Sequence, residues 1–290
     1  MTARARERRE VCGAPYGGAR AASRAMTAMA AATVLLATGA AAQGLSRQVG
    51  RVSDGTVRFS FASRPDICGN GRGTVRFGNR GNTVSVSGSS RSFSTSTHNE
   101  WVDDCENGPV RVSMDFAGGQ VIEVRTYVGG RWRGGSDVTD LGTVGARDAV
   151  DYLLDVVARG TGRAAGEAIF PATLADSVVV WPRLIALAKD EARTRDARHQ
   201  ALFWVGQAAG DKATEGLRDV VGDAAADRDV RLQAVFAISQ RPRDEGIPAL
   251  IAVARSSKDR EIRRQAIFWL GQSNDPRALA FFEAILSPER

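Results

Sequence analysis

The sequence predicts a chain of two folded parts, a small antiparallel β domain followed by an α-solenoid of stacked helical hairpins. Three observations support this multidomain class, which combines α and β parts. Residues 43–135 alternate apolar and polar side chains with the two-residue period of strands. Residues 147–290 are rich in alanine, leucine and arginine and have helical spacing. Within these helical residues a sequence pattern recurs about every 33 residues, which is typical of repeat architectures.

Residues 1–42 have the composition of a secretory signal peptide. They hold six arginines against two acids, which accounts for most of the formal net charge of +6. An apolar run from Ala28 leads to a small-residue site at Ala40 to Ala42, which favours cleavage before Gln43. The run is shorter than the roughly 20 residues that span a bilayer, so an uncleaved anchor is the weaker alternative. We therefore expect an exported protein, periplasmic or associated with the cell envelope, without a stable membrane span after cleavage.

The cysteines agree with export. Cleavage removes Cys12 and leaves Cys68 and Cys105, an even pair in a compartment where disulfides persist. We expect this pair to be bonded. A metal site that combines both thiols with His98 is the alternative, but the cysteines lack metal-site spacing. We predict no metal and interpret the neighbouring acids as a solvated loop, since they lack the spacing of a calcium loop: Asp103, Asp104 and Glu106.

The β domain, residues 43–135, contains three strand units. Residues 56–63, "TVRFSFAS", alternate clearly, and residues 83–95 do so more weakly. Residues 110–128, "VRVSMDFAGGQVIEVRTYV", are two alternating runs joined by two glycines, which is a hairpin signal. A domain of this size buries limited apolar surface, so a disulfide would stabilise it.

A Gly-rich linker at residues 136–146 precedes the solenoid at residues 147–290. An Ala-x-Phe triplet recurs in it at steps of 33, 33 and 32 residues, and an apolar anchor further along keeps the same step. The unit is therefore a helix-turn-helix, present in about four copies. In the last three copies an acid precedes an Arg-x-Gln-Ala motif that begins at Arg198, Arg231 and Arg263. Each acid stands where its charge meets the positive end of the helix dipole.

The repeats resemble the HEAT-repeat family, in particular short bacterial repeats related to those of phycobilin lyases. The resemblance rests on "DVRLQAVFAIS…DEGIPALIAVA" and "EIRRQAIFWLGQSNDPRALAFFEAIL" and covers residues 163–290. It is weaker in the first copy, where Ala165 replaces the arginine and Pro171 interrupts the helix. A diverged first repeat is also what a solenoid cap requires. The resemblance implies a protein-binding scaffold without shared catalytic residues, and lyase activity is not carried over.

A row of phenylalanines is the main candidate for partner binding. On a helical wheel with Ala266 at zero, Trp269 and Leu270 fall within about 60° of it, whereas Phe268 lies near 200°. Stacked repeats would align Phe268 with its counterparts and place a row of glutamines beside them. The members of both rows are Phe170, Phe203, Phe236 and Phe268, with Gln200, Gln233 and Gln265. One account packs the rings between neighbouring helices as core; the sharper hypothesis makes them an exposed stripe that docks a partner.

For two other features, the repeated arginines and the histidines, a structural role is the commoner interpretation. The repeated arginines fit Asp/Arg ladders between repeats better than anion or phosphopeptide binding. The two histidines, His98 and His199, are interpreted as a loop residue and a surface variant. No phosphate-binding loop, dinucleotide fingerprint or nucleophile elbow is present, so we expect no enzymatic activity and no cofactor. Nucleic-acid binding is not expected either, because the basic excess lies in the leader.

The predicted function is that of an exported, non-enzymatic scaffold or adaptor whose HEAT-repeat solenoid binds another protein. The alternative is an accessory protein whose β domain binds a glycan or small ligand while the repeats serve dimerisation.

Overall fold

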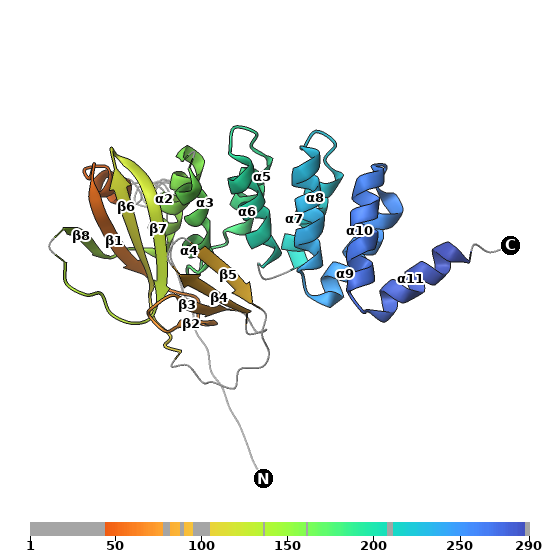
Figure 1. Cartoon of the computed structure of the whole chain (residues 1–290), viewed down its shortest axis with the longest axis horizontal. Coiled ribbons are helices and arrows are strands. Elements are labelled where there is room, and N and C mark those ends of the chain that lie inside the picture. Colours follow the sequence, from red (N-terminus) through yellow and green to blue (C-terminus); the bar gives the residue numbers. More distant parts are fainter. Residues whose placement is uncertain are drawn as a thin grey trace, which may run out of the picture. The chain divides into compact units, whose positions relative to one another are not determined.

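The structure, a computed structural model, describes residues 44–77, 82–87, 90–94, 105–135, 137–160, 162–207 and 211–287. The expected leader and its cleavage site lie outside these residues, as do His98, Asp103 and Asp104. Residues 42–290 cluster as one compact unit. A β part is followed by successive helices, as Figure 1 shows. No helix in the described ranges is long and apolar enough to cross a membrane.

The described strands form two four-stranded sheets, and they include all three strand units expected from the sequence. The order in the first sheet is β7 (Gln120–Val128), β6 (Val110–Ala117), β1 (Gly55–Phe61) and β8 (Val138–Thr143). The order in the second is β2 (Ile67–Gly69), β3 (Thr74–Phe77), β4 (Asn82–Ser87) and β5 (Ser90–Ser94). Every pairing is antiparallel except that of β1 with β8.

Strand β8 differs from expectation, because it occupies the range expected to be a Gly-rich linker. It runs parallel to β1 at the edge of the first sheet, and Arg58 of β1 pairs with Asp140 at 2.9 Å. Its side chains are mostly exposed. The strand therefore lacks an alternating apolar face, and its pairing depends on a backbone partner about 80 residues away in sequence, which local patterns do not report.

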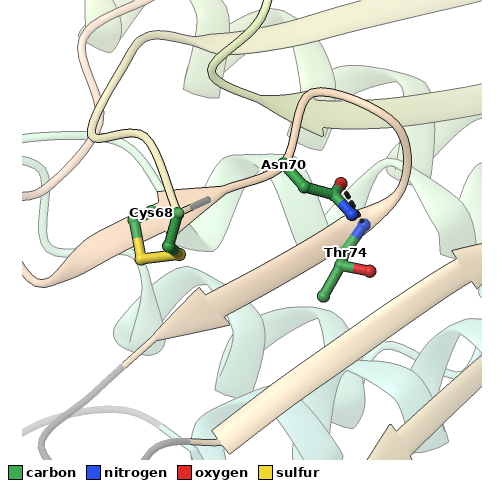
Figure 2. The surroundings of a disulfide bond; sticks show 4 residues. Cys68, Asn70 and Thr74 are labelled. Atoms are coloured by element: carbon green, nitrogen blue, oxygen red, sulfur yellow. Dashed lines mark hydrogen bonds between the residues drawn. A yellow bond between two sulfur atoms is a disulfide. The ribbon is translucent and has the colours of Figure 1, made fainter. Parts of the chain in front are cut away.

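Cys68 of β2 and Cys105 form the expected disulfide (Figure 2). Beside it the backbones of Gly69 and Glu106 exchange hydrogen bonds of 3.0 and 2.8 Å. The Asn70 side-chain oxygen closes the turn between β2 and β3 by accepting from three backbone N–H groups, those of Arg72, Gly73 and Thr74. The disulfide thus fixes the segment before β6 to the second sheet.

The helices after α2 (Ala146–Arg159) pair into four repeats. Repeat 1 contains α3 (Arg163–Glu167), α4 (Ile169–Thr173) and α5 (Trp181–Lys189), and repeat 2 contains α6 (Arg195–Gly206) and α7 (Asp211–Gly222). Repeat 3 contains α8 (Arg228–Ser239) and α9 (Arg243–Ser256), and repeat 4 contains α10 (Arg260–Gln272) and α11 (Pro276–Leu286). First helices pack on first helices, α4 to α6 to α8 to α10, and second helices pack on second helices from α5 to α11.

The first helix of repeat 1 is broken, as Pro171 predicts. Helix α3 ends at Glu167 and α4 begins at Ile169. A proline removes its own N–H donor and its ring displaces the carbonyl four residues earlier, which here belongs to Glu167. Backbone hydrogen bonds of 3.0 Å join this repeat to the β part, from Arg64 N–H to Leu174 and from Asp176 N–H to Ala62. A continuous cluster of buried apolar side chains includes both the sheets and the helices.

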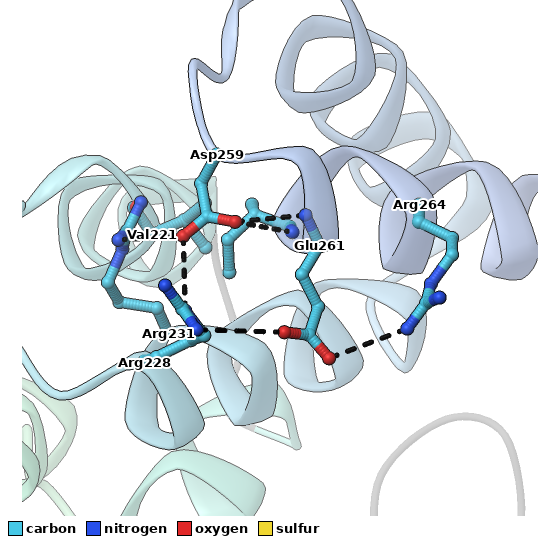
Figure 3. A network of polar contacts seen from close by, with 7 residues as sticks. Val221, Arg228, Arg231, Asp259, Glu261 and Arg264 are labelled. Atoms are coloured by element: carbon cyan, nitrogen blue, oxygen red, sulfur yellow. Dashed lines mark hydrogen bonds and ion pairs between the residues drawn. The ribbon is translucent and has the colours of Figure 1, made fainter.

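An ion-pair ladder connects repeats 2, 3 and 4, in agreement with the structural interpretation of the repeated arginines. Arg198 pairs with Asp227 at the start of α8. Arg231 lies 3.5 Å from Asp259 at the start of α10, and Arg228 lies at the same distance (Figure 3). Each arginine therefore contacts the acid that begins the next repeat.

Repeats 2 and 3 also meet through backbone and a buried arginine. A Cβ at Gly206 would lie 2.9 Å from the carbonyl oxygen of Ala237, so glycine permits the approach of α6 to α8. The guanidinium of Arg241 is 1% exposed and reaches the Thr214 hydroxyl at 2.9 Å and the Glu245 carboxylate at 2.7 Å. A buried charge requires such partners, so this network fixes the junction.

Removing the disulfide should destabilise the β part. Its loop spans 37 residues, and loop-closure entropy for that length corresponds to about 4 kcal/mol. We expect Cys68→Ser/Cys105→Ser to lower the free energy of unfolding by roughly this amount in non-reducing denaturant titrations. As a control, adding reductant should destabilise the wild type but leave the variant unchanged. Equal stability of both proteins without reductant would contradict the prediction.

Stability should fall in acid through Asp275, which begins α11. Hydrogen bonds from Arg277 lower the pKa of Asp275 from 3.8 to about 2. Because the folded-state pKa lies below the unfolded value, the charged carboxylate stabilises the fold above about pH 4, and this contribution is lost as pH falls towards about 2. Asp275→Asn should lower Tm at pH 7 but not at pH 2. The control is Asp219→Asn at an exposed position; a Tm difference independent of pH would contradict the assignment.

Candidate functional site

The phenylalanine row is divided into two aromatic groups, each centred on a tryptophan. Trp204 stacks on Phe170 of the preceding repeat, with ring centroids 4.8 Å apart, and its edge meets Phe203 at 5.1 Å. Trp269 lies between Phe236 and Phe268 in the same way, at 5.2 and 5.0 Å. Each tryptophan therefore receives a ring from the repeat before it and one from its own helix.

Exposure along the row is graded, so the two accounts apply to different members of it. Phe170 is fully buried and cannot take part in docking, because α3 and α4 lie within the core shared with the β part. Phe203 and Phe236 are half-buried, since each has a following first helix. Phe268 is 51% exposed. Phe170 is thus a core residue, and Phe268 is the member of the row to which the docking hypothesis still applies.

The glutamine row is uniform. Gln200, Gln233 and Gln265 are all half-buried. Their side-chain amides make no hydrogen bond to any other residue that the structure describes. Of the three, Gln265 shares its helix with the exposed Phe268, so it is the amide placed to serve a partner there.

Repeat 4 carries most of the large apolar side chains that are exposed in the described part of the chain. Seven large apolar side chains are exposed among the described residues, and five of them lie on α10 and α11: Ile267, Phe268, Leu279, Ile285 and Leu286. Among the described residues no first helix of a further repeat packs on α10 over Phe268. Apolar surface gathered in this way is typical of an interaction site.

Among the described residues, the arginines of α10 also lack the acidic partners that the equivalent arginines of α8 have. Arg260 and Arg263 stand at the repeat positions of Arg228 and Arg231, which both contact an acid of the next repeat. Arg263 hydrogen-bonds the Ser257 carbonyl at 2.6 Å, and Arg260 has no acidic partner in the described part of the chain. Sequence reasoning missed Arg260, although its equivalence to Arg228 follows from the period.

The internal repeats indicate what this surface fits. Repeat 3 receives from repeat 4 an aspartate at the start of a helix, Asp259, and an indole ten residues later, Trp269. The Asp259 carboxylate is fixed in position, since it accepts hydrogen bonds from two backbone N–H groups. Desolvation opposes its ionisation, but these bonds and the neighbouring arginines lower its pKa. A helix with the same acid and aromatic spacing would satisfy Arg260 and Phe268.

His199, interpreted from the sequence as a surface variant, also contacts the next repeat. It is half-buried on α6, and its Nε2 lies 3.1 Å from Asp229 of the next repeat. Desolvation raises the pKa of Asp229, but hydrogen bonds from Arg195 and His199 outweigh it and lower the pKa. The histidine therefore belongs to the ladder. Within the described ranges no group of three or more potential metal ligands occurs.

Comparison with known proteins agrees with this geometry. The family model described as HEAT repeats matches residues 223–290. Comparison with curated proteins finds no match. Among solved structures, human deoxyhypusine hydroxylase in complex with glycerol is 16% identical, with a TM-score of 0.32, over 50% of this chain and 62% of that one. A similarity this low carries no argument about activity, and the resemblance to phycobilin lyase repeats stays a prediction. Residues 223–290 of this chain therefore belong to the HEAT-repeat family.

Proposed function

We propose that this chain is an exported, non-enzymatic scaffold that binds a helix of a partner protein on repeat 4. The observation that carries the proposal is the exposure of Phe268 on a helix whose internal equivalents are covered by the next repeat. The partner helix would begin with an acid that pairs with Arg260 and Arg263 and would place a large ring against Phe268.

Export is supported by the leader pattern and the disulfide. Disulfides persist in oxidising compartments such as the periplasm. The leader combines an arginine-rich start, an apolar run and a small-residue site. A periplasmic or envelope-associated adaptor accommodates all of these features.

The docking face can be tested with a defined probe, a synthetic hairpin of residues 258–287, which carries Asp259 and Trp269 in the spacing that repeat 3 accepts. The full chain should bind it by fluorescence anisotropy. Phe268→Ser should weaken binding about tenfold, the loss expected from one buried anchor. Because the ring is half exposed, unfolding free energy should change by less than about 1 kcal/mol.

Two controls accompany this measurement. Val179→Ser removes an apolar side chain that is 70% exposed outside repeat 4 and should leave binding unchanged. A probe with Asp259→Arg should bind more weakly, because its helix start would repel Arg260. Equal binding of both probes, or no binding by the wild-type chain, would exclude this face as a helix-docking site.

Export makes a separate prediction. The protein isolated from a bacterial envelope fraction should begin at Gln43 by N-terminal sequencing, because Ala40 and Ala42 form the small-residue site. Replacing both alanines by phenylalanine should block cleavage and leave the longer form in the membrane fraction. A protein that retains residues 26–42 in the wild type would show that the segment is not a cleaved leader.

A further inference from the structure

A cavity of about 650 Å³ lies between the β part and the first helices. Its walls come from the helical segment 44–49 and the loop after it, from β6 and β7 near their hairpin turn, and from α2 and α3. The volume falls in the range of small-molecule sites in proteins. Such sites prefer the meeting place of structural units, which is where this cavity lies.

The cavity walls combine apolar and polar groups and are held in place by backbone contacts. Apolar side chains from several elements line it, among them Val49, Phe116, Val121 and Val156. The β6–β7 turn is tied to the opposite wall, because the Gly119 N–H donates to the Ser53 carbonyl at 2.7 Å. The cavity therefore does not depend on a ligand to bring its walls together.

A tyrosine side chain of α2 reaches the cavity. Tyr152 lines the cavity, is only 5% exposed, and its ring meets Phe59 edge to face at 6.3 Å. Its hydroxyl forms no hydrogen bond with any other described residue. Burial raises the pKa of Tyr152, so the hydroxyl stays protonated at neutral pH and is available as a donor. The hydroxyl is therefore available to hydrogen-bond a ligand or water in the cavity.

The charged residues of the lining are all cationic. Arg51 and Arg159 line the cavity, and none of the lining residues is an aspartate or glutamate. Arg159 pairs with Asp155 at 3.1 Å, but both side chains are more than half exposed, so this pair is weak. Arg51 has no acidic partner in the described part of the chain. The cavity thus combines apolar side chains with two arginines, of which Arg51 has no acidic partner among the described residues.

We propose that this cavity binds an amphipathic carboxylate, a single anionic head on an apolar body such as a medium-chain fatty acid. The apolar body packs against Val121 and Val156, the carboxylate accepts hydrogen bonds from Arg51 and Arg159, and the Tyr152 hydroxyl donates a further bond. Charge-assisted hydrogen bonds from guanidinium groups favour carboxylates over neutral heads. This site is independent of the docking face on repeat 4, and it makes the small-ligand alternative specific.

The test uses dodecanoate below its micelle-forming concentration with the full chain in isothermal titration calorimetry. Dodecanoate should bind with one site per chain, and dodecyltrimethylammonium, which has the same tail and the opposite charge, should not. Arg51→Glu/Arg159→Glu should weaken dodecanoate binding by about tenfold or more. Tyr152→Phe should weaken it severalfold while leaving the circular dichroism spectrum and Tm near those of the wild type.

The matched control is Arg147→Glu, a charge reversal of the same kind at an exposed position of α2 outside the cavity. It should bind dodecanoate as the wild type does. No binding by the folded wild-type chain, or equal binding of the cationic detergent, overturns the proposal. So does an unchanged affinity in the double arginine variant.

Discussion

A single helical hairpin of this kind cannot bury its own apolar face, and the rest of the structure follows from that constraint. Each repeat needs a neighbour, and the neighbour supplies a ring, an acid or both. Trp204 and Trp269 provide the rings, and Asp227 and Asp259 provide the acids. At the junction of repeats 3 and 4 both come from α10, so that α10 placed one residue out of register would lose the ring contact and the ion pair together.

The first and the last described repeats meet this constraint in different ways. At the beginning, the β part takes the role of the missing neighbour, and α3 and α4 are buried within a core shared with the sheets. Pro171 bends the first helix there and leaves Phe170 fully enclosed. At repeat 4 the described chain offers no equivalent cover, and Phe268 faces outward. Phe170 and Phe268 stand at the same place in their repeats. Their different exposure therefore depends on what covers each repeat.

The period was enough to predict the helical part, because two anchors with one step define both helices and their register. The break at Pro171 and the disulfide also followed from local chemistry. Exposure of the phenylalanines did not, because a helical wheel describes one helix and not its neighbours. Strand β8 was missed because its pairing with β1 is long-range and its side chains are polar. The cavity beside Tyr152 could not be foreseen, since its walls come from segments up to about 120 residues apart.

The position occupied by Trp204 and Trp269 alternates with smaller residues, Pro171 and Ala237, in repeats 1 and 3. Aromatic contacts of the indoles thus join repeat 1 to repeat 2 and repeat 3 to repeat 4. The close approach of Gly206 to Ala237 joins one pair of hairpins to the other. The modular unit of this solenoid is therefore a pair of hairpins. A rearrangement that duplicated or deleted one hairpin alone would bring two indoles or two small side chains into adjacent positions, whereas the loss or gain of a pair would keep the alternation.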